Sequence, residues 1–265
     1  MYDILRTLKT LSLFKDIDFH IDILEINPYF KKIQMERLLT FAKVRHFDSI
    51  HDIPFEDCPT ILIAHEFFDA IPVDAFFLKG STLNHITINH LNKSLSFDSS
   101  SDPSLILSDF SKSYINTNLK IDSSIELSES TYLILKKICY LFRKISNLSL
   151  GIIVDYGHNN PSEFSLRAVK GHSQADFFKD IGTTDISFNV DFKYVSEIIK
   201  DNNLIVQDTI SQAKFLIKNG ALERNTILKS HNPHMSKMLD ANLFRLMSPN
   251  QMGNIYKVLT FKNIQ

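Results

Sequence analysis

Two short, uninterrupted apolar runs, each followed by an acidic side chain, constrain the fold of this chain more than any other feature. Ile61–Ala64 leads, after one residue, into Glu66, and Leu150–Val154 leads directly into Asp155. Such runs are typical of strands that a sheet buries on both faces. The apolar spacing over residues 128–146 is helical and leads into the second run. The pattern therefore predicts an α/β fold containing a strand–helix–strand unit.

The remaining patterns continue this alternation, and they show no internal repeat and no linker. A helix around Ile4–Leu11 precedes a strand at Ile21–Ile26, and Asn27 and Pro28 are suited to begin the next helix. We predict one domain over residues 1–265 with a β-hairpin insertion at 73–98, followed by a loop at 98–104. Further elements are expected as strands at 42–47, 204–206 and 255–261, an extended segment at 185–190, and helices at 194–200, 211–219 and 234–247.

Charge and composition exclude several classes of protein. The chain has 29 Lys and Arg against 30 Asp and Glu, so the basic excess of a nucleic-acid-binding protein is absent. Its two cysteines are too few for a disulfide framework or a cysteine-based zinc site. No apolar run approaches the roughly 20 residues of a membrane span, and the N-terminal segment contains acidic residues, unlike a targeting peptide. We expect a soluble protein of the cytoplasm or of the mitochondrial matrix.

Glycine is scarce in this chain. It has 7 glycines, whereas average usage of about 7% would give roughly 18. No two of them stand close enough to form a glycine-rich phosphate or dinucleotide loop. A self-contained cofactor loop of that kind is therefore excluded within these residues.

Acidic residues follow three of the predicted strands, where ligands of open α/β sheets gather. These are Glu25, then Glu66 with Asp69, and Asp155. An acid after a second strand can accept both ribose hydroxyls of an adenosine ligand, or it can simply be exposed at a strand–helix junction. Glu66 and Asp69 would share a face of a helical turn and could hold a guanidinium group. The alternative is that the two phenylalanines between them are core and Asp69 caps the turn.

The histidines do not predict a metal site. His65, His158 and His172 could in principle meet acidic residues at the strand ends, but no H-E-x-x-H motif or other tight ligand spacing is present. A G-x-S-x-G nucleophile elbow is also missing. We expect no metal.

The segment HEFFDAIPV at 65–73 resembles the N-E-F-F-D-A-L-P-V signature of the MidA family of methyltransferases. Further blocks are similar in the same order along nearly the whole chain. They are LEINPYFKKIQ (24–34), GIIVDYGH (151–158), SLRAVKGHSQADFFKDIGTTDISFNVDF (165–192), ISQAKFLIKNGALER (210–224) and LMSPNQMGNIYKVLTF (246–261).

This resemblance implies a Rossmann-like class I S-adenosylmethionine-dependent methyltransferase. The family includes a mitochondrial protein arginine methyltransferase that assists assembly of respiratory complex I, so a complex I subunit is the implied protein partner. By position, Glu25 would bind the ribose of S-adenosylmethionine with His65 on the same cofactor side, and Glu66 and Asp69 would lie beside the reacting centre. The substrate side would be formed by Asp155, Arg167 and His172.

The chain also departs from the family pattern. The family's first strand and its E-x-G-x-G-x-G-x-L loop precede a helix that begins D-I-L-R, and Asp3–Arg6 matches that helix. His65 replaces the family's Asn, and Ala75 stands where Gln is usual. Two hypotheses follow: a methyltransferase whose first strand and loop come from a longer chain or a separate N-terminal polypeptide, or a non-catalytic remnant that acts as a binding or assembly factor.

Overall fold

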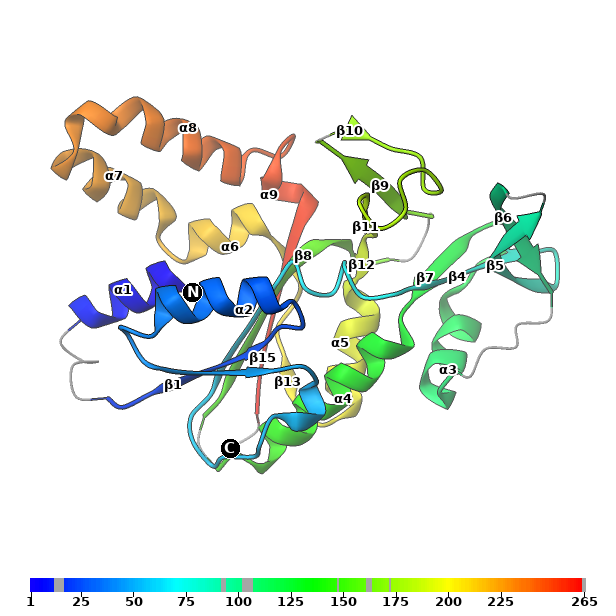
Figure 1. Cartoon of the computed structure of the whole chain (residues 1–265), viewed down its shortest axis with the longest axis horizontal. Helices are drawn as coiled ribbons and strands as arrows, with labels where there is room; N and C mark the ends of the chain where they lie inside the picture. Colours follow the sequence, from blue (N-terminus) through cyan, green and yellow to red (C-terminus); the bar gives the residue numbers. More distant parts are fainter. Residues whose placement is uncertain are drawn as a thin grey trace. The chain divides into compact units, whose positions relative to one another are not determined.

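The computed structural model describes residues 1–11, 17–91, 94–101, 107–146, 148–160, 164–171 and 173–263. It divides into two compact units, Met1–Glu56 and Asp57–Gln265. Figure 1 shows the elements of both units. No helix in the described ranges is long and apolar enough to cross a membrane.

The first unit is a small α/β layer. Strands β1 (His20–Leu24) and β2 (Lys43–Phe47) pair in parallel, and helices α1 (Tyr2–Thr10) and α2 (Pro28–Leu38) accompany them, with a short 3-10 helix at Ile50–Asp52. Asn27 caps α2 as predicted, because its side chain accepts the N–H groups of Tyr29 and Phe30. The buried core of this unit consists of Leu5, Ile21, Leu38 and Val44.

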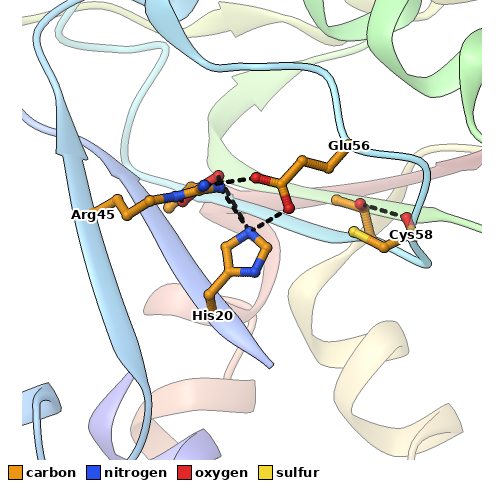
Figure 2. Close-up of polar contacts among 6 residues, drawn as sticks. His20, Arg45, Glu56 and Cys58 are labelled. Atoms are coloured by element: carbon orange, nitrogen blue, oxygen red, sulfur yellow. Dashed lines mark hydrogen bonds and ion pairs between the residues drawn. The ribbon is translucent and has the colours of Figure 1, made fainter. Parts of the chain in front are cut away.

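An ion network holds the end of this unit to its two strands (Figure 2). Asp22 and Arg45 lie opposite each other in the parallel ladder, and Arg45 donates two hydrogen bonds of 2.6 and 2.7 Å to the Asp22 carboxylate. Arg45 also pairs with Glu56 at 2.6 Å and contacts His20 Nε2 at 2.7 Å. The paired, partly buried guanidinium therefore fastens residue 56 to the strands.

The second unit is built on a mixed sheet. Its order is β12 (Val190–Asp191), β8 (Leu150–His158), β15 (Tyr256–Lys262) and β13 (Ile205–Val206), with β3 (Ile61–His65) also paired to β8 and β14 (Ile210–Ser211) to β15. Strands β3, β8 and β12 run parallel, and β15 runs antiparallel to β8. The prediction of an α/β fold is confirmed.

Helices α4 (Glu129–Lys144) and α5 (Phe192–Asp201) accompany this sheet and lie side by side in Figure 1. Ser128 caps α4 and Asp191 caps α5 through side-chain acceptors of backbone N–H groups. Helices α6 (Gln212–Lys218), α7 (Ala221–His231), α8 (Ser236–Met247) and α9 (Met252–Ile255), with a 3-10 turn at Pro233–Met235, lead into β15. The buried core includes Leu135, Ile153, Ile198, Leu259 and Phe261.

Two smaller sheets complete this unit. One has the order β6 (Ser94–Ser100), β5 (Thr82–Leu91), β4 (Asp74–Lys79) and β7 (Ser124–Leu127), all antiparallel, and helix α3 (Asp109–Asn118) precedes β7. The other has the order β10 (Ser173–Gln174), β9 (Arg167–Lys170) and β11 (Asp185–Ser187). The range 73–98 predicted as a hairpin therefore contains β4, β5 and most of β6, three of the four strands of this sheet.

Three sequence-based expectations need correction. The loop predicted at 98–104 begins too early, because β6 pairs with β5 as far as Ser100, while residues 102–106 lie outside the described ranges. The run Ile61–Ala64 is not buried on both faces: Ile61 is 68% exposed and Ile63 is 40% exposed, and these alternate residues share one face of β3. Gly220 ends α6 as predicted, but in its left-handed conformation it also begins α7, for which no helix was predicted.

The close approach of β12 to β8 gives a test of packing in the sheet. A Cβ at Gly157 would lie 2.3 Å from the Val190 carbonyl oxygen and 2.7 Å from the Phe192 ring. We expect Gly157→Ala to lower the free energy of unfolding by about 3 kcal/mol, since backbone cannot yield as a flexible side chain can. Urea unfolding measures this. In the control Gly80→Ala the new Cβ meets no atom within 4 Å, so the variant carries only the strain of its φ of +61°, which costs about 1 kcal/mol. Equal losses of unfolding free energy in both variants would contradict the prediction.

Candidate active site at the carboxyl end of the sheet

The turn that follows β3 carries the first two acidic side chains of the site. Glu66 has a φ of 49°, unusual for a residue with a side chain, and its N–H donates to the Val154 carbonyl of β8 at 3.0 Å. This bond extends the β3–β8 ladder by one residue. The chain then turns sharply, so that Asp69 is buried while Glu66 retains 45% of its side-chain exposure.

Asp155 holds this turn in place. Its carboxylate is fully buried, and its Oδ2 accepts backbone N–H groups from three successive residues, Phe67 at 3.2 Å, Phe68 at 3.0 Å and Asp69 at 3.3 Å. Its Oδ1 accepts the N–H of Tyr156 at 2.9 Å. A buried carboxylate surrounded by N–H donors is well satisfied, so Asp155 fixes the backbone from which Glu66 and Asp69 project.

The two buried carboxyls of the site, Asp155 and Asp69, both have raised pKa values. Burial raises the pKa of Asp155 to about 7, and the charge of Asp69 adds to this rise, while backbone N–H donors oppose it. Burial also raises the pKa of Asp69, and the nearby charge of Glu66 adds to that rise, whereas Arg167 opposes it. A carboxyl with a raised pKa is a better proton acceptor near neutral pH than an ordinary one.

The raised pKa of Asp155 predicts a dependence of stability on pH. The folded state binds this proton more tightly than the unfolded chain, whose Asp pKa is near 3.8. The resulting stability is complete below pH about 4 and is lost as the pH rises through about 7. The loss is on the order of 2 to 4 kcal/mol.

We therefore expect the melting temperature to fall between pH 5 and pH 8, and to fall less in Asp155→Asn, which has no carboxyl to titrate. The exposed control Asp240→Asn should keep the wild-type slope, since the pKa of Asp240 is lowered by its partners Lys229 and Asn225. Calorimetric melts at three or four pH values decide the matter. Parallel pH dependence of the wild type and Asp155→Asn would show that Asp155 does not cause it.

One cation faces these acids. Arg167, the first residue of β9, donates from Nη1 to Asn189 Oδ1 at 2.8 Å, and its guanidinium lies 4.9 Å from the centre of the Tyr156 ring. Its buried Nη2 has no hydrogen-bond partner in the described residues. Arg167 is within electrostatic range of Asp69 and Glu126. In the described residues, three acidic side chains of this turn and of β8, Glu66, Asp69 and Asp155, thus lie close together, with the guanidinium of Arg167 near Asp69.

Aromatic rings form one wall of the site. Tyr256 and Tyr156 pack with ring centres 4.2 Å apart, and the His65 ring lies 6.2 Å from that of Tyr256. The Tyr256 hydroxyl donates to Glu66 Oε1 at 2.7 Å, and His65 Nε2 is 3.9 Å from the same oxygen. Sequence reasoning did not select Tyr256, although a polar aromatic residue at the start of the last strand was a usable signal.

Glu25 belongs to the first unit. It follows β1, where its N–H donates to the Phe47 carbonyl at 3.1 Å. Its Oε1 accepts the N–H of Asn27 at 2.9 Å, and its Oε2 accepts from Gln34 at 3.3 Å, which in turn contacts His46 at 3.0 Å. The side chain is thereby fixed at the carboxyl end of the strand, and each oxygen keeps a lone pair for a ligand hydroxyl.

Of the other histidines considered from the sequence, His158 does not join this group. His172 lies outside the described residues. His158 lies beside Asp191, its pKa is lowered by burial, and its buried Nδ1 has no hydrogen-bond partner among the described groups. In the described parts of the chain no three His, Cys, Asp or Glu side chains gather as metal ligands. The structure thus brings together His65, Glu66, Asp69, Asp155 and Arg167.

Comparison with known sequences identifies relatives. The profile of a family described as "Putative S-adenosyl-L-methionine-dependent methyltransferase" matches residues 1–210. The mitochondrial protein arginine methyltransferase NDUFAF7 homolog of Caenorhabditis elegans is 31% identical over 198 residues, covering 72% of this chain and 44% of that protein. The Danio rerio protein arginine methyltransferase NDUFAF7 is 26% identical over 288 residues, covering 98% and 65%. The chain thus spans less than two thirds of these relatives.

Comparison with solved structures supports the fold. A crystal structure of a protein from Burkholderia thailandensis bound to S-adenosyl-homocysteine superposes with a TM-score of 0.78 at 16% identity, covering 99% of this chain and 68% of that one. A second structure from the same organism gives the same TM-score and identity, covering 98% and 70%. The α/β fold with a mixed sheet is shared, and the family predicted from the sequence blocks is confirmed.

Proposed function

Because the chain belongs to a family of S-adenosyl-L-methionine-dependent methyltransferases, we propose that it transfers a methyl group from S-adenosylmethionine to a guanidinium nitrogen of arginine in a protein. The observation that carries the choice of substrate is the turn after β3. It presents Glu66 and Asp69 three residues apart, with Asp155 hydrogen-bonded to the turn backbone and the guanidinium of Arg167 near Asp69. Such an excess of carboxylate charge suits a cationic side chain.

The chain's own residues can carry the required steps. Glu66 is the accessible carboxylate and can hold the guanidinium by a charge-assisted hydrogen bond, which orients one nitrogen for attack. The nitrogen loses a proton as it forms its bond to carbon, and the Glu66–Asp69 pair can accept that proton, since the pKa of Asp69 is raised by burial and by Glu66. When bound, S-adenosylmethionine supplies the electrophilic methyl group.

The cofactor side of the site fits the ribose. Glu25 keeps acceptor capacity beside its two hydrogen bonds, and its position after β1 is where the two ribose hydroxyls of an adenosine ligand would be accepted. His65, with 55% of its side chain exposed beside Glu66, is proposed as a further cofactor-binding residue. Neither role requires a metal.

The sheet edges support the proposal that a further strand and a glycine-rich loop complete the cofactor site. Within the described residues β1 pairs only with β2, and β3 pairs only with β8. Each strand therefore keeps one edge with unpaired backbone groups, which a parallel strand could occupy. None of the chain's 7 glycines belongs to a glycine-rich loop that could approach the cofactor closely.

The family resemblance extends the proposal to the partner and its location. We propose that the methylated protein is a subunit of respiratory complex I, and that the enzyme acts in the mitochondrial matrix if it is eukaryotic and in the cytoplasm if it is bacterial. The relatives from Caenorhabditis elegans and Danio rerio are named as mitochondrial protein arginine methyltransferases.

A transfer assay tests the proposed function. With methyl-labelled S-adenosylmethionine and a set of purified complex I subunits, we expect label in arginine of at least one subunit. A variant of that subunit with lysine in place of the arginine should take up none. Because the cofactor loop is proposed to lie elsewhere, the assay includes the strand and loop segment of a relative, added in trans or fused. Failure to label any subunit in all these forms would favour the non-catalytic alternative.

A further inference from the structure

Tyr256 forms a short hydrogen bond to Glu66, the carboxylate that we propose binds the substrate. It is only 2% exposed, and its hydroxyl donates to Glu66 Oε1 at 2.7 Å. The two residues are 190 positions apart in the sequence. An exposed glutamate normally samples several rotamers, so a buried donor that holds one of its oxygens restricts where the other oxygen lies.

The sheet explains how this contact is built. Strand β15 runs antiparallel to β8, so its first residue lies at the edge where β3 and β8 end. Tyr256 is directly opposite Tyr156 in the ladder, and their rings pack 4.2 Å apart. Ladder pairing and ring packing together fix the position of the hydroxyl, which needs no rearrangement to reach Glu66.

The hydroxyl remains a donor at any pH at which the enzyme works. Burial raises the pKa of Tyr256, and the neighbouring Tyr156 and Glu66 side chains raise it further. Glu66 Oε2 makes no hydrogen bond within the described residues, and His65 approaches only Oε1, at 3.9 Å. One oxygen of Glu66 is therefore held by the protein, and the other is free for a ligand.

We propose that Tyr256 is the positioning residue of this site: its hydroxyl fixes Glu66 Oε1 so that Oε2 receives the guanidinium nitrogen that is methylated. The inference rests on the proposed function. It implies that Glu66 holds its substrate through one oxygen, and that Tyr256 acts on the rate of transfer and not on binding of the methyl donor.

The test is Tyr256→Phe, made in the protein supplied with the strand and loop segment of a relative; the change keeps the ring stack and removes only the hydroxyl. We expect kcat for methyl transfer to fall about tenfold, in line with the loss of one hydrogen bond to a charged group. The Kd for S-adenosyl-homocysteine, measured by calorimetry, should change less than twofold. The matched control is Tyr194→Phe, which removes another buried tyrosine hydroxyl, bonded to Ser111 at 2.8 Å, and should leave kcat unchanged.

A second readout needs no activity. In protein labelled with ¹³C at tyrosine Cζ, the Tyr256 resonance should begin to titrate at lower pH in Glu66→Gln than in the wild type, because the variant lacks the carboxylate charge that raises the pKa of Tyr256. Wild-type kcat in Tyr256→Phe, or a Tyr256 titration indifferent to Glu66, would overturn the positioning role alone. A wild type that transfers no methyl group under any condition would overturn the proposed function, and this inference with it.

Discussion

Replacing Glu66 with glutamine is expected to lower the rate of methyl transfer at least 100-fold while changing cofactor affinity less than twofold. Glutamine has the same shape, can adopt the φ of 49°, and can still accept the Tyr256 hydroxyl bond. Only the negative charge is lost. Without it the guanidinium is neither held by a charge-assisted bond nor offered a basic oxygen, and such losses typically cost 10² to 10⁴ in rate.

Single-turnover transfer of labelled methyl measures the rate, and calorimetry with S-adenosyl-homocysteine measures affinity. Glu223→Gln on helix α7 removes the same charge in the same way from an exposed position and should be indistinguishable from the wild type. An unchanged rate in Glu66→Gln would remove this residue from the chemistry. A parallel loss of cofactor affinity would instead place Glu66 on the cofactor side.

The strand ends were predictable because their signal is local. An apolar run followed by an acid predicts a buried strand and places the acid at its carboxyl end, where ligands bind. Glu66 and Asp155 could therefore be assigned to one edge of the sheet without a structure. The helix starts at Asn27, Ser128 and Ser211 were likewise predictable, since each cap acts within three residues.

Contacts between distant segments were not predictable in this way. Nothing near Glu66 in the sequence indicates that Tyr256 will bond to it, because the contact depends on the antiparallel entry of β15 beside β8. The same holds for Arg167, whose orientation is set by Asn189 and by the Tyr156 ring. The apolar run of β3 led to a wrong prediction of burial on both faces. Hydrophobicity indicates that a strand can be buried, but it does not indicate which neighbouring elements cover it.

Asp155 makes contacts in the structure that its position in the sequence does not indicate. Its predicted place on the substrate side came from the family resemblance, and direct contact with a substrate stays a prediction. In the structure both of its oxygens accept backbone N–H groups and no part of it is exposed. We expect its effect on catalysis to pass through the turn that carries Glu66 and Asp69.

The second large effect concerns the cofactor. We expect the 265 residues alone to show a melting shift of less than 1 °C with millimolar S-adenosylmethionine, and a shift of several degrees once a relative's first strand and glycine-rich loop are fused before them. Binding stabilises a fold by RT ln(1 + [L]/Kd), about 2.7 kcal/mol at a hundredfold excess over Kd. A completed site should therefore be plainly visible in the melt.

The physical basis is that the fused segment would add two kinds of contact. Its strand would offer backbone groups to a strand edge that has no partner in the described residues, such as that of β3, and its loop would bring backbone N–H groups to the cofactor. Glu25→Gln in the fused protein serves as the control, since loss of the proposed ribose acceptor should abolish most of the shift without lowering the melting temperature of the free protein by more than a few degrees. A shift of several degrees in the unfused chain would show that its own residues already form the cofactor site, and the role assigned to the additional strand would then be wrong.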